Sequence, residues 1–218
     1  MRLRLGCPRV ALIVAPHADD ETIGAFGLIR ALRGAGTIVR VIVVTDGAAS
    51  HPSSRLWPRD RLVRAREGET RRAMRRMGVA RSAICFLRMP DGHLPLDAAA
   101  CRQRLGAAVR RAGKLDMIVG PDRDDDHADH RQVAATLAAL HLPGVRRLRF
   151  KVWPTGSRAR RAASLILPPQ LRDAKRLALR SYRTQCGLIR DDPRGFAMSH
   201  RQIAAFTRQQ ELFMEGRR

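Results

Sequence analysis

Short apolar runs alternate along the chain with longer segments whose apolar residues recur at helical spacing. The apolar runs predict β-strands at residues 10–15, 39–45, 83–87, 115–119 and 148–153. The helical spacing predicts helices at 21–32, 60–77, 96–112, 129–140, 169–182 and 200–214. Strands and helices that alternate in this way form a mostly parallel sheet with helices on both faces. The pattern therefore predicts an α/β fold, a Rossmann-like three-layer sandwich with about five or more strands.

We expect a single domain of residues 1–218, because a chain of this length can bury one sizeable core. The alternation of strands and helices is clear over a core of about residues 8–155. Residues 156–218 begin with a basic loop and then show only the last two helical patterns. This part is expected to be a C-terminal helical extension.

The chain has no apolar run near the roughly 18 residues that a membrane-spanning helix needs. Its N-terminal apolar segment leads into charged residues and not into a small-residue cleavage site, so we expect no signal peptide. The four cysteines are far apart and form no Cys-x-x-Cys pair, which indicates reduced thiols. These features together predict a cytoplasmic protein.

The formal net charge is +22, which attracts nucleic acid, anionic membrane surfaces or acidic substrates. However, 39 of the 42 basic residues are arginine, in a chain also rich in alanine, as a GC-rich coding bias would produce. The arginines are spread from Arg2 to Arg218 and form no stripe with interleaved aromatic residues. We therefore expect no specific nucleic-acid partner, and peripheral contact with an anionic membrane stays open.

Two clusters of acidic and histidine residues directly follow predicted strands. Residues 16–21, Pro-His-Ala-Asp-Asp-Glu, follow the first strand, and residues 122–130 follow the fourth. The carboxyl ends of parallel strands meet at one edge of a sheet, where ligands bind in such folds. Closely packed carboxylates and imidazoles are costly to desolvate unless a partner such as a divalent metal compensates them. The sequence therefore predicts a metal site, and the absence of a Gly-x-Gly-x-x-Gly turn argues against a dinucleotide site.

His17, Asp20 and His130 would supply two imidazoles and one carboxylate, the ligand set of a hydrolytic zinc site with an open position for water. His127 and His130 are three residues apart at the start of a helix. Only one of them is therefore expected to reach the metal, while the other stands over it. Glu21 is expected to support the start of the helix. The predicted cofactor is Zn²⁺, with Fe²⁺ as an alternative.

At these residues the chain resembles the PIG-L/LmbE-type zinc-dependent N-acetylglucosaminyl deacetylases. The resemblance rests on residues 16–21 and on His-Ala-Asp-His at 127–130, and it covers about residues 8–155. Thr-Asp-Gly at 45–47, Arg-Ala-Arg-Glu at 64–67 and Asp-Gly at 91–92 support it. The family usually has proline where this chain has Ala18, and often at Ala128, but neither position carries a ligand.

The resemblance implies a hydrolytic N-deacetylase that removes acetate from an N-acetylglucosamine-type sugar or sugar conjugate. In this mechanism a zinc-activated water attacks the acetamide, with Asp19 as the general base. Protonated His127, held in its charged form by Asp129, stabilises the oxyanion. Arg64 and Asp91 are implied to bind the substrate.

Two alternatives stay open. One is an amidase that acts on a thiol-sugar conjugate of the mycothiol type. The other is a non-catalytic, basic Rossmann-like protein that binds nucleic acid or anionic surfaces. The loops 46–58 and 157–171 are expected to decide the substrate. Trp57 and Trp153 could stack on a sugar ring or simply pack, and His51 and His93 are placed outside the site.

Overall fold

A computed structural model describes residues 1–154 and 162–215, and within these ranges seven strands form one sheet. The strands are β1 (Val10–Ala15), β2 (Ile38–Thr45), β3 (Ile84–Met89), β4 (Met117–Pro121), β5 (Arg146–Phe150), β6 (Ala163–Ile166) and β7 (Gln210–Glu215). Their order in the sheet is β3-β2-β1-β4-β5-β7-β6. The first five strands run parallel, and β7 is antiparallel to both β5 and β6. The predicted mostly parallel α/β sheet is confirmed.

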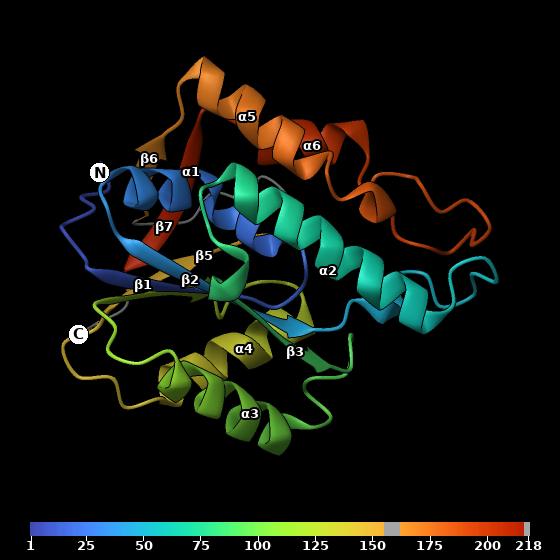
Figure 1. Cartoon of the computed structure of the whole chain (residues 1–218), viewed down its shortest axis with the longest axis horizontal. Coiled ribbons are helices and arrows are strands. Elements are labelled where there is room, and N and C mark those ends of the chain that lie inside the picture. Colours follow the sequence, from blue (N-terminus) through green and yellow to red (C-terminus); the bar gives the residue numbers. More distant parts are fainter. Residues whose placement is uncertain (155–161, 216–218) are drawn as a thin grey trace.

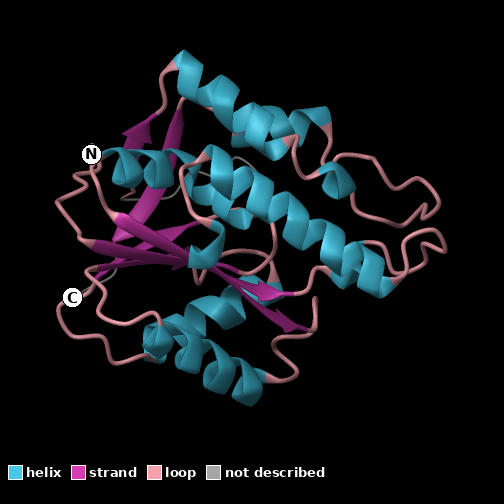
Figure 2. Ribbon diagram, in the orientation of Figure 1, coloured by secondary structure: helices cyan, strands magenta, loops and turns pink. Residues whose placement is uncertain are grey.

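Helices cover both faces of the sheet (Figures 1 and 2). They are α1 (Asp20–Gly34), α2 (Arg59–Arg76), α3 (Ala98–Arg111), α4 (Ala128–Ala139), α5 (Pro169–Leu179) and α6 (His200–Phe206). Helices α1, α2, α5 and α6 lie on one face, and α3 and α4 lie on the other (Figure 1).

The central strand β1 is buried on both faces, which explains its unbroken apolar sequence. Because side chains alternate along a strand, Ala11 and Ile13 join the core under α1 and α2. Leu12 and Val14 join the second core, under α3 and α4. The sheet therefore separates two apolar layers, and its polar functional groups can collect only at the strand ends.

The last third of the chain differs from the prediction, because it contributes strands as well as helices. The helix predicted over 200–214 ends at Phe206, and the chain continues into β7. Neither β6 nor β7 was predicted. These segments are so short that the spacing of their apolar residues does not distinguish a helix from a strand. Their structure is decided by the pairing of β7 with β5 and β6. Residues 155–161 of the predicted basic loop lie outside the described residues.

Helix α1 is kinked at Ala25, which has a non-helical backbone conformation. Just after the kink, the Glu211 carboxylate of β7 accepts hydrogen bonds from two backbone N–H groups. One comes from Gly27 at 2.9 Å, and the other comes from Leu28 at 3.2 Å. The Glu211 side chain, from the other end of the sequence, thereby accepts hydrogen bonds from helix N–H groups that the kink leaves without their regular helical acceptors.

Lys175 of α5 completes this arrangement on the other side of the kink. Its ammonium donates to the carbonyl oxygen of Ile23 at 2.7 Å and to the Glu211 carboxylate at 2.8 Å. Both charged side chains are almost fully buried, so each depends on the other for compensation. The C-terminal part of the chain is thus joined to the helix that begins at the acidic cluster.

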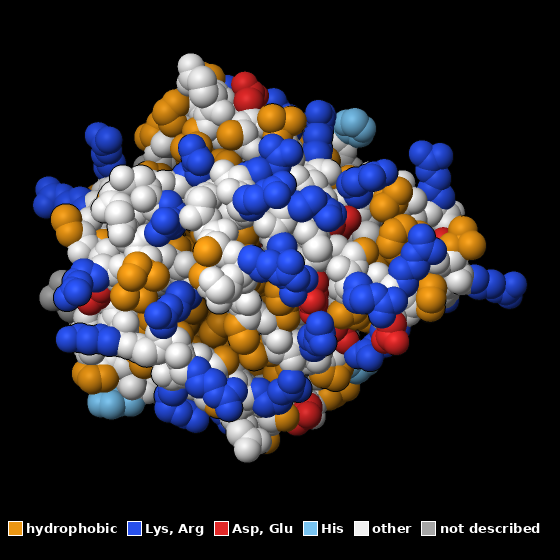
Figure 3. All heavy atoms as spheres, in the orientation of Figure 1, with side chains coloured by type: hydrophobic (Ala, Val, Ile, Leu, Met, Phe, Trp, Pro, Cys, Tyr) orange, Lys and Arg blue, Asp and Glu red, His pale blue; other side chains and the backbone are white. Residues whose placement is uncertain are grey.

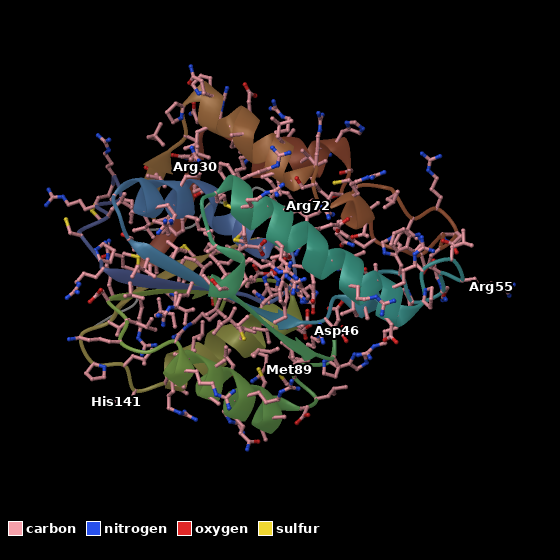
Figure 4. The ribbon with its side chains drawn as sticks, viewed as in Figure 1. Arg30, Asp46, Arg55, Arg72, Met89 and His141 are labelled. Atoms are coloured by element: carbon pink, nitrogen blue, oxygen red, sulfur yellow. The ribbon has the colours of Figure 1, made fainter. Side chains whose placement is uncertain are left out.

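Basic side chains are scattered over the surface. Figure 3 shows Lys and Arg spread across the whole visible face, and not gathered into one stripe. Figure 4 labels three of them: Arg30 on α1, Arg72 on α2 and Arg55 in the connection between β2 and α2. Among the described residues, no helix combines the length and the apolar character needed to cross a bilayer.

We predict that Lys175→Met lowers the free energy of unfolding by about 3–5 kcal/mol, because it leaves the Glu211 carboxylate buried without its charged partner. Urea unfolding followed by circular dichroism measures this loss. The matched control is Asp173→Ala on the same helix, which breaks the exposed pair of Asp173 with Arg176 and should cost below about 1 kcal/mol. Equal losses in the two variants would contradict the prediction.

Candidate active site

Three connections meet at the carboxyl edge of the sheet. The β1–α1 connection carries His17, and α1 begins at Asp20. The β3–α3 connection carries Asp91, and the start of α4 brings His127 and His130. Asp46 and Met89, labelled in Figure 4, mark the ends of β2 and β3 on this side, where the Asp46 N–H donates to the Met89 carbonyl at 2.9 Å. The two clusters found in the sequence therefore lie together.

Three side-chain atoms that could bind a metal ion form a nearly equilateral triangle. The Nδ1 of His17 lies 3.1 Å from the Oδ2 of Asp20 and 3.2 Å from the Nε2 of His130. The His130 Nε2 lies 3.1 Å from the same carboxylate oxygen. Zinc–ligand distances of about 2.0–2.1 Å in a tetrahedral site would separate neighbouring ligand atoms by about 3.3 Å. The arrangement therefore fits a divalent metal.

A third imidazole lies close to this triangle. His17, His127 and His130 each present a nitrogen within 4.8 Å of the others. His127 is therefore close enough to be an alternative ligand. Asp20 is the better third ligand because its oxygen is equally near both His17 and His130.

The other nitrogen of His17 faces two carboxylates. Its Nε2 lies 3.1 Å from Asp91 and 3.2 Å from Asp129. Burial opposes a charged imidazole, but these carboxylates and Asp20 raise the pKa of His17 well above its usual value. Asp129 is itself held by the backbone N–H groups of Gly92 at 2.8 Å and Leu94 at 3.0 Å. Asp129 therefore orients His17, so that Nδ1 points toward the metal position.

Asp125 holds the second imidazole in the same way. Its Oδ2 lies 3.2 Å from the Nδ1 of His130 and accepts hydrogen bonds from the backbone N–H groups of Val152 and Trp153. Its other oxygen accepts from the backbone N–H of His127 at 3.0 Å. Asp125 is 1% exposed, and this one carboxylate ties α4 to the segment after β5. Sequence reasoning assigned it no role, because nothing distinguishes it from its acidic neighbours until the chain is folded.

The ring of His127 was expected to pair with the Asp129 carboxylate, but it bonds to the Asp129 backbone. Its Nδ1 accepts a hydrogen bond from the backbone N–H of Asp129 at 3.2 Å, while the Asp129 carboxylate contacts His17. Burial, with the nearby imidazoles of His17 and His130, lowers the pKa of His127. In the structure, the hydrogen bond between Asp129 and the His127 ring therefore comes from the Asp129 backbone and not from its carboxylate. Because its Nδ1 accepts this hydrogen bond, Nε2 is the ring nitrogen of His127 that remains available as a donor.

Asp19 has a strained backbone, with φ at 121°. Such a conformation is rare outside glycine and is found where a site requires it. Its carboxylate lines the cavity, and one of its oxygens lies 3.7 Å from Nη2 of Arg66. Burial raises the pKa of Asp19 well above its usual value, and Asp20 and Glu21 add to this while Arg66 opposes it. A raised pKa suits a group that accepts and later returns a proton near neutral pH.

Glu21 lies beneath the site and is fully buried. It accepts hydrogen bonds from the Tyr182 hydroxyl and from the Asp19 backbone N–H, the latter at 3.2 Å. Burial raises the pKa of Glu21 to about 7. Glu21 thus supports the start of α1, as expected, through contacts with the C-terminal part of the chain.

Arg66, and not Arg64, faces the cavity. Arg64 is exposed, whereas Arg66 is 3% exposed and lines the cavity wall. Two positions along a helix differ by about 200° around its axis, so the two side chains point in opposite directions. The Arg66 guanidinium donates to the carbonyl oxygens of Ala18 at 2.7 Å and Gly47 at 3.1 Å. Its buried Nε has no hydrogen-bond partner among the described residues. Arg64, the predicted substrate contact, lies outside the cavity lining.

The site opens into a cavity of about 560 Å³. His17, Asp19, Asp20 and His127 lie on its polar side, with Asp91. A more apolar part of the lining comes largely from the C-terminal half of the chain. It consists of Trp153, Pro154, Gln185, Phe196 and Met198, with Ile23 of α1. Of these residues, the sequence analysis singled out Trp153, as a side chain that could stack on a sugar ring.

Comparison with known proteins gives a family match for this chain. The sequence profile of the PIG-L family, described as GlcNAc-PI de-N-acetylase, matches residues 12–141. None of the curated proteins is significantly similar to this chain.

Solved structures share the fold. N,N'-diacetylchitobiose deacetylase from Pyrococcus horikoshii has a TM-score of 0.73 and 20% identity, over 96% of this chain and 84% of that chain. The zinc-inhibited form of teicoplanin deacetylase has a TM-score of 0.65 and 20% identity, over 82% of this chain and 85% of that chain. The 4-carboxy-2-hydroxymuconate hydratase from Pseudomonas putida also has a TM-score of 0.65, with 17% identity, over 91% and 83% of the two chains.

We predict that Asp125→Asn lowers the affinity for zinc by about 10- to 100-fold, because the substitution removes the carboxylate that orients His130. Competition with a chromogenic chelator measures this affinity directly. Asp124→Asn, in the same loop but exposed, is the matched control and should bind zinc like the wild type. Unchanged affinity in Asp125→Asn, with the fold intact, would show that Asp125 does not position the ligand.

Proposed function

The chain belongs to the PIG-L family, and we propose that it is a zinc-dependent N-deacetylase that acts on an N-acetylglucosamine-type sugar or sugar conjugate. The observation that carries the proposal is the triangle of His17, Asp20 and His130 beside Asp19, at the wall of an open cavity. Two of the structural neighbours, the diacetylchitobiose and teicoplanin enzymes, are deacetylases, which supports the same reaction class here.

When bound by His17, Asp20 and His130, zinc lowers the pKa of a water molecule and polarises the acetamide carbonyl. Asp19 accepts the proton of the attacking water as the new C–O bond forms. It then returns that proton to the nitrogen as the C–N bond breaks, which releases acetate and the free amine. Neutral His127 donates its Nε2–H to the carbonyl oxygen as negative charge develops there.

Asp91 and Arg66 are the proposed substrate contacts. The hydrogen bond with His17 and its charge outweigh burial and lower the pKa of Asp91 to about 2, so this carboxylate is an acceptor at neutral pH. The Arg66 guanidinium, which carries only N–H donors, lies in the wall of the same cavity. An acceptor and a donor on one wall suit the hydroxyl groups of a sugar ring.

The fold by itself permits other chemistry, because a hydratase shares it. A hydratase adds water across a C=C bond and releases no acetate. A thiol-sugar amidase remains within the proposed reaction class and differs only in the group attached to the sugar. Release of acetate from a panel of N-acetylated sugars therefore separates these functions.

We predict that the zinc-loaded protein releases acetate from N-acetylglucosamine conjugates, and that Asp19→Asn lowers kcat by roughly 10²–10⁴-fold, because the base is lost. Zinc content is measured in parallel and should be unchanged, since Asp19 is not a proposed ligand. Removal of zinc by a chelator should abolish acetate release, and added zinc should restore it. Full activity of Asp19→Asn would reject the assigned base.

We predict that Arg66→Lys lowers kcat/KM for acetate release by roughly 10- to 100-fold, because lysine cannot reproduce the guanidinium's planar set of donors. Steady-state kinetics with the best substrate of the panel measures this loss. Arg64→Lys, on the exposed side of the same helix, is the matched control and should stay within about twofold of the wild type. The reverse ranking would restore Arg64 as the substrate contact.

A further inference from the structure

A second cavity lies beside the first one. It has a volume of about 360 Å³ and is formed by the β2–α2 connection and the β3–α3 connection. Asp91 and Ala49 line both cavities, so together they are a shared wall. A ligand that passes over Asp91 can therefore occupy both spaces. The volume is within the range of about 300–1,000 Å³ that small-molecule sites have.

Trp57 supplies a fixed aromatic surface in this second cavity. Its backbone N–H donates to the Ser54 hydroxyl at 3.0 Å, and that hydroxyl donates to Asp191 at 2.7 Å. The Arg61 guanidinium lies 4.2 Å from the centre of the Trp57 ring and does not line the cavity. Because Trp57 lines the cavity and Arg61 does not, the part of the ring that faces the cavity is available to a ligand.

Polar groups surround this aromatic surface. The Nδ1 of His93 donates to the Asp91 carbonyl at 2.7 Å, so its Nε2 is left as an acceptor. The Arg59 guanidinium donates to the Asp46 carboxylate, so these two charges compensate each other, and Asp91, the other carboxylate of the cavity, faces His17. This balance favours a neutral ligand over an anionic one. A flat apolar face with hydrogen-bonding groups at its edge matches a sugar ring, which presents C–H groups on its faces and hydroxyls around its rim.

We propose that this second cavity is a subsite for a second pyranose ring, joined to the N-acetylated ring that occupies the first cavity. The proposal rests on the proposed deacetylase function and extends it, because it makes the substrate a glycoside of at least two rings. Trp57 determines this specificity by stacking on the second ring, while Asp91 lies between the two rings.

The test compares acetate release from N-acetylglucosamine with release from N,N'-diacetylchitobiose. The wild-type enzyme should prefer the disaccharide by about tenfold or more in kcat/KM. Trp57→Ala should lower kcat/KM for the disaccharide by about 5- to 10-fold and leave the monosaccharide within about twofold. Trp57→Phe should retain most of the preference. Leu56→Ala is the matched control, because Leu56 is 64% exposed in the same loop and lies outside the cavity.

Equal losses on both sugars in Trp57→Ala, or no loss on either, would overturn the subsite while the deacetylase function stands. A second measurement does not depend on turnover: calorimetric binding of both sugars to zinc-loaded Asp19→Asn. Tighter binding of the disaccharide that is lost in Asp19→Asn/Trp57→Ala supports the subsite, even if the wild type releases no acetate and the deacetylase function fails. Equal binding of the two sugars to Asp19→Asn overturns the subsite.

Discussion

The structure depends on the compensation of a dense polar cluster at the carboxyl edge of an otherwise apolar sheet. Three imidazoles and several carboxylates lie within a few ångströms of one another there, and most are buried. Each group would be costly alone, and each is paired with another or with backbone N–H groups. Asp129 holds His17, Asp125 holds His130, and Glu21 supports the backbone of Asp19. These contacts fix His17 and His130 in orientations in which one nitrogen of each ring lies close to the Asp20 carboxylate.

The C-terminal part of the chain takes part in this compensation, although it lies far away in sequence. Tyr182 bonds to Glu21, and Glu211 with Lys175 satisfies the kinked backbone of α1. Thr184 bonds to the buried Glu69 of α2 through its N–H at 3.0 Å and its hydroxyl at 2.6 Å. The neighbouring Gln185 lies in the wall of the first cavity. The same contacts therefore stabilise the fold and position the more apolar part of that cavity's lining.

The β2–α2 connection plays a comparable part on the other side of the site. Its tip, marked by Arg55 in Figure 4, projects past the body of the molecule. Ser53 and Ser54 bond to Asp192 and Asp191 of the C-terminal part, which holds the connection in place. The two loops are thus fixed against each other, and between them they shape the space in which a substrate would lie.

The alternating strands and helices, the edge of the sheet at which the site lies and the types of residue in it could all be predicted from the sequence. These features follow from local periodicity and from the rule that parallel strands end at one edge. Only the tertiary structure decided that Arg66 and not Arg64 faces the cavity, that Asp129 orients His17 and that residues 210–215 form a strand. Each of these depends on a contact between distant segments or on the direction of one side chain. A sequence shows how residues are spaced along the chain. The partner of a buried charged side chain, however, is set by how distant segments pack against each other.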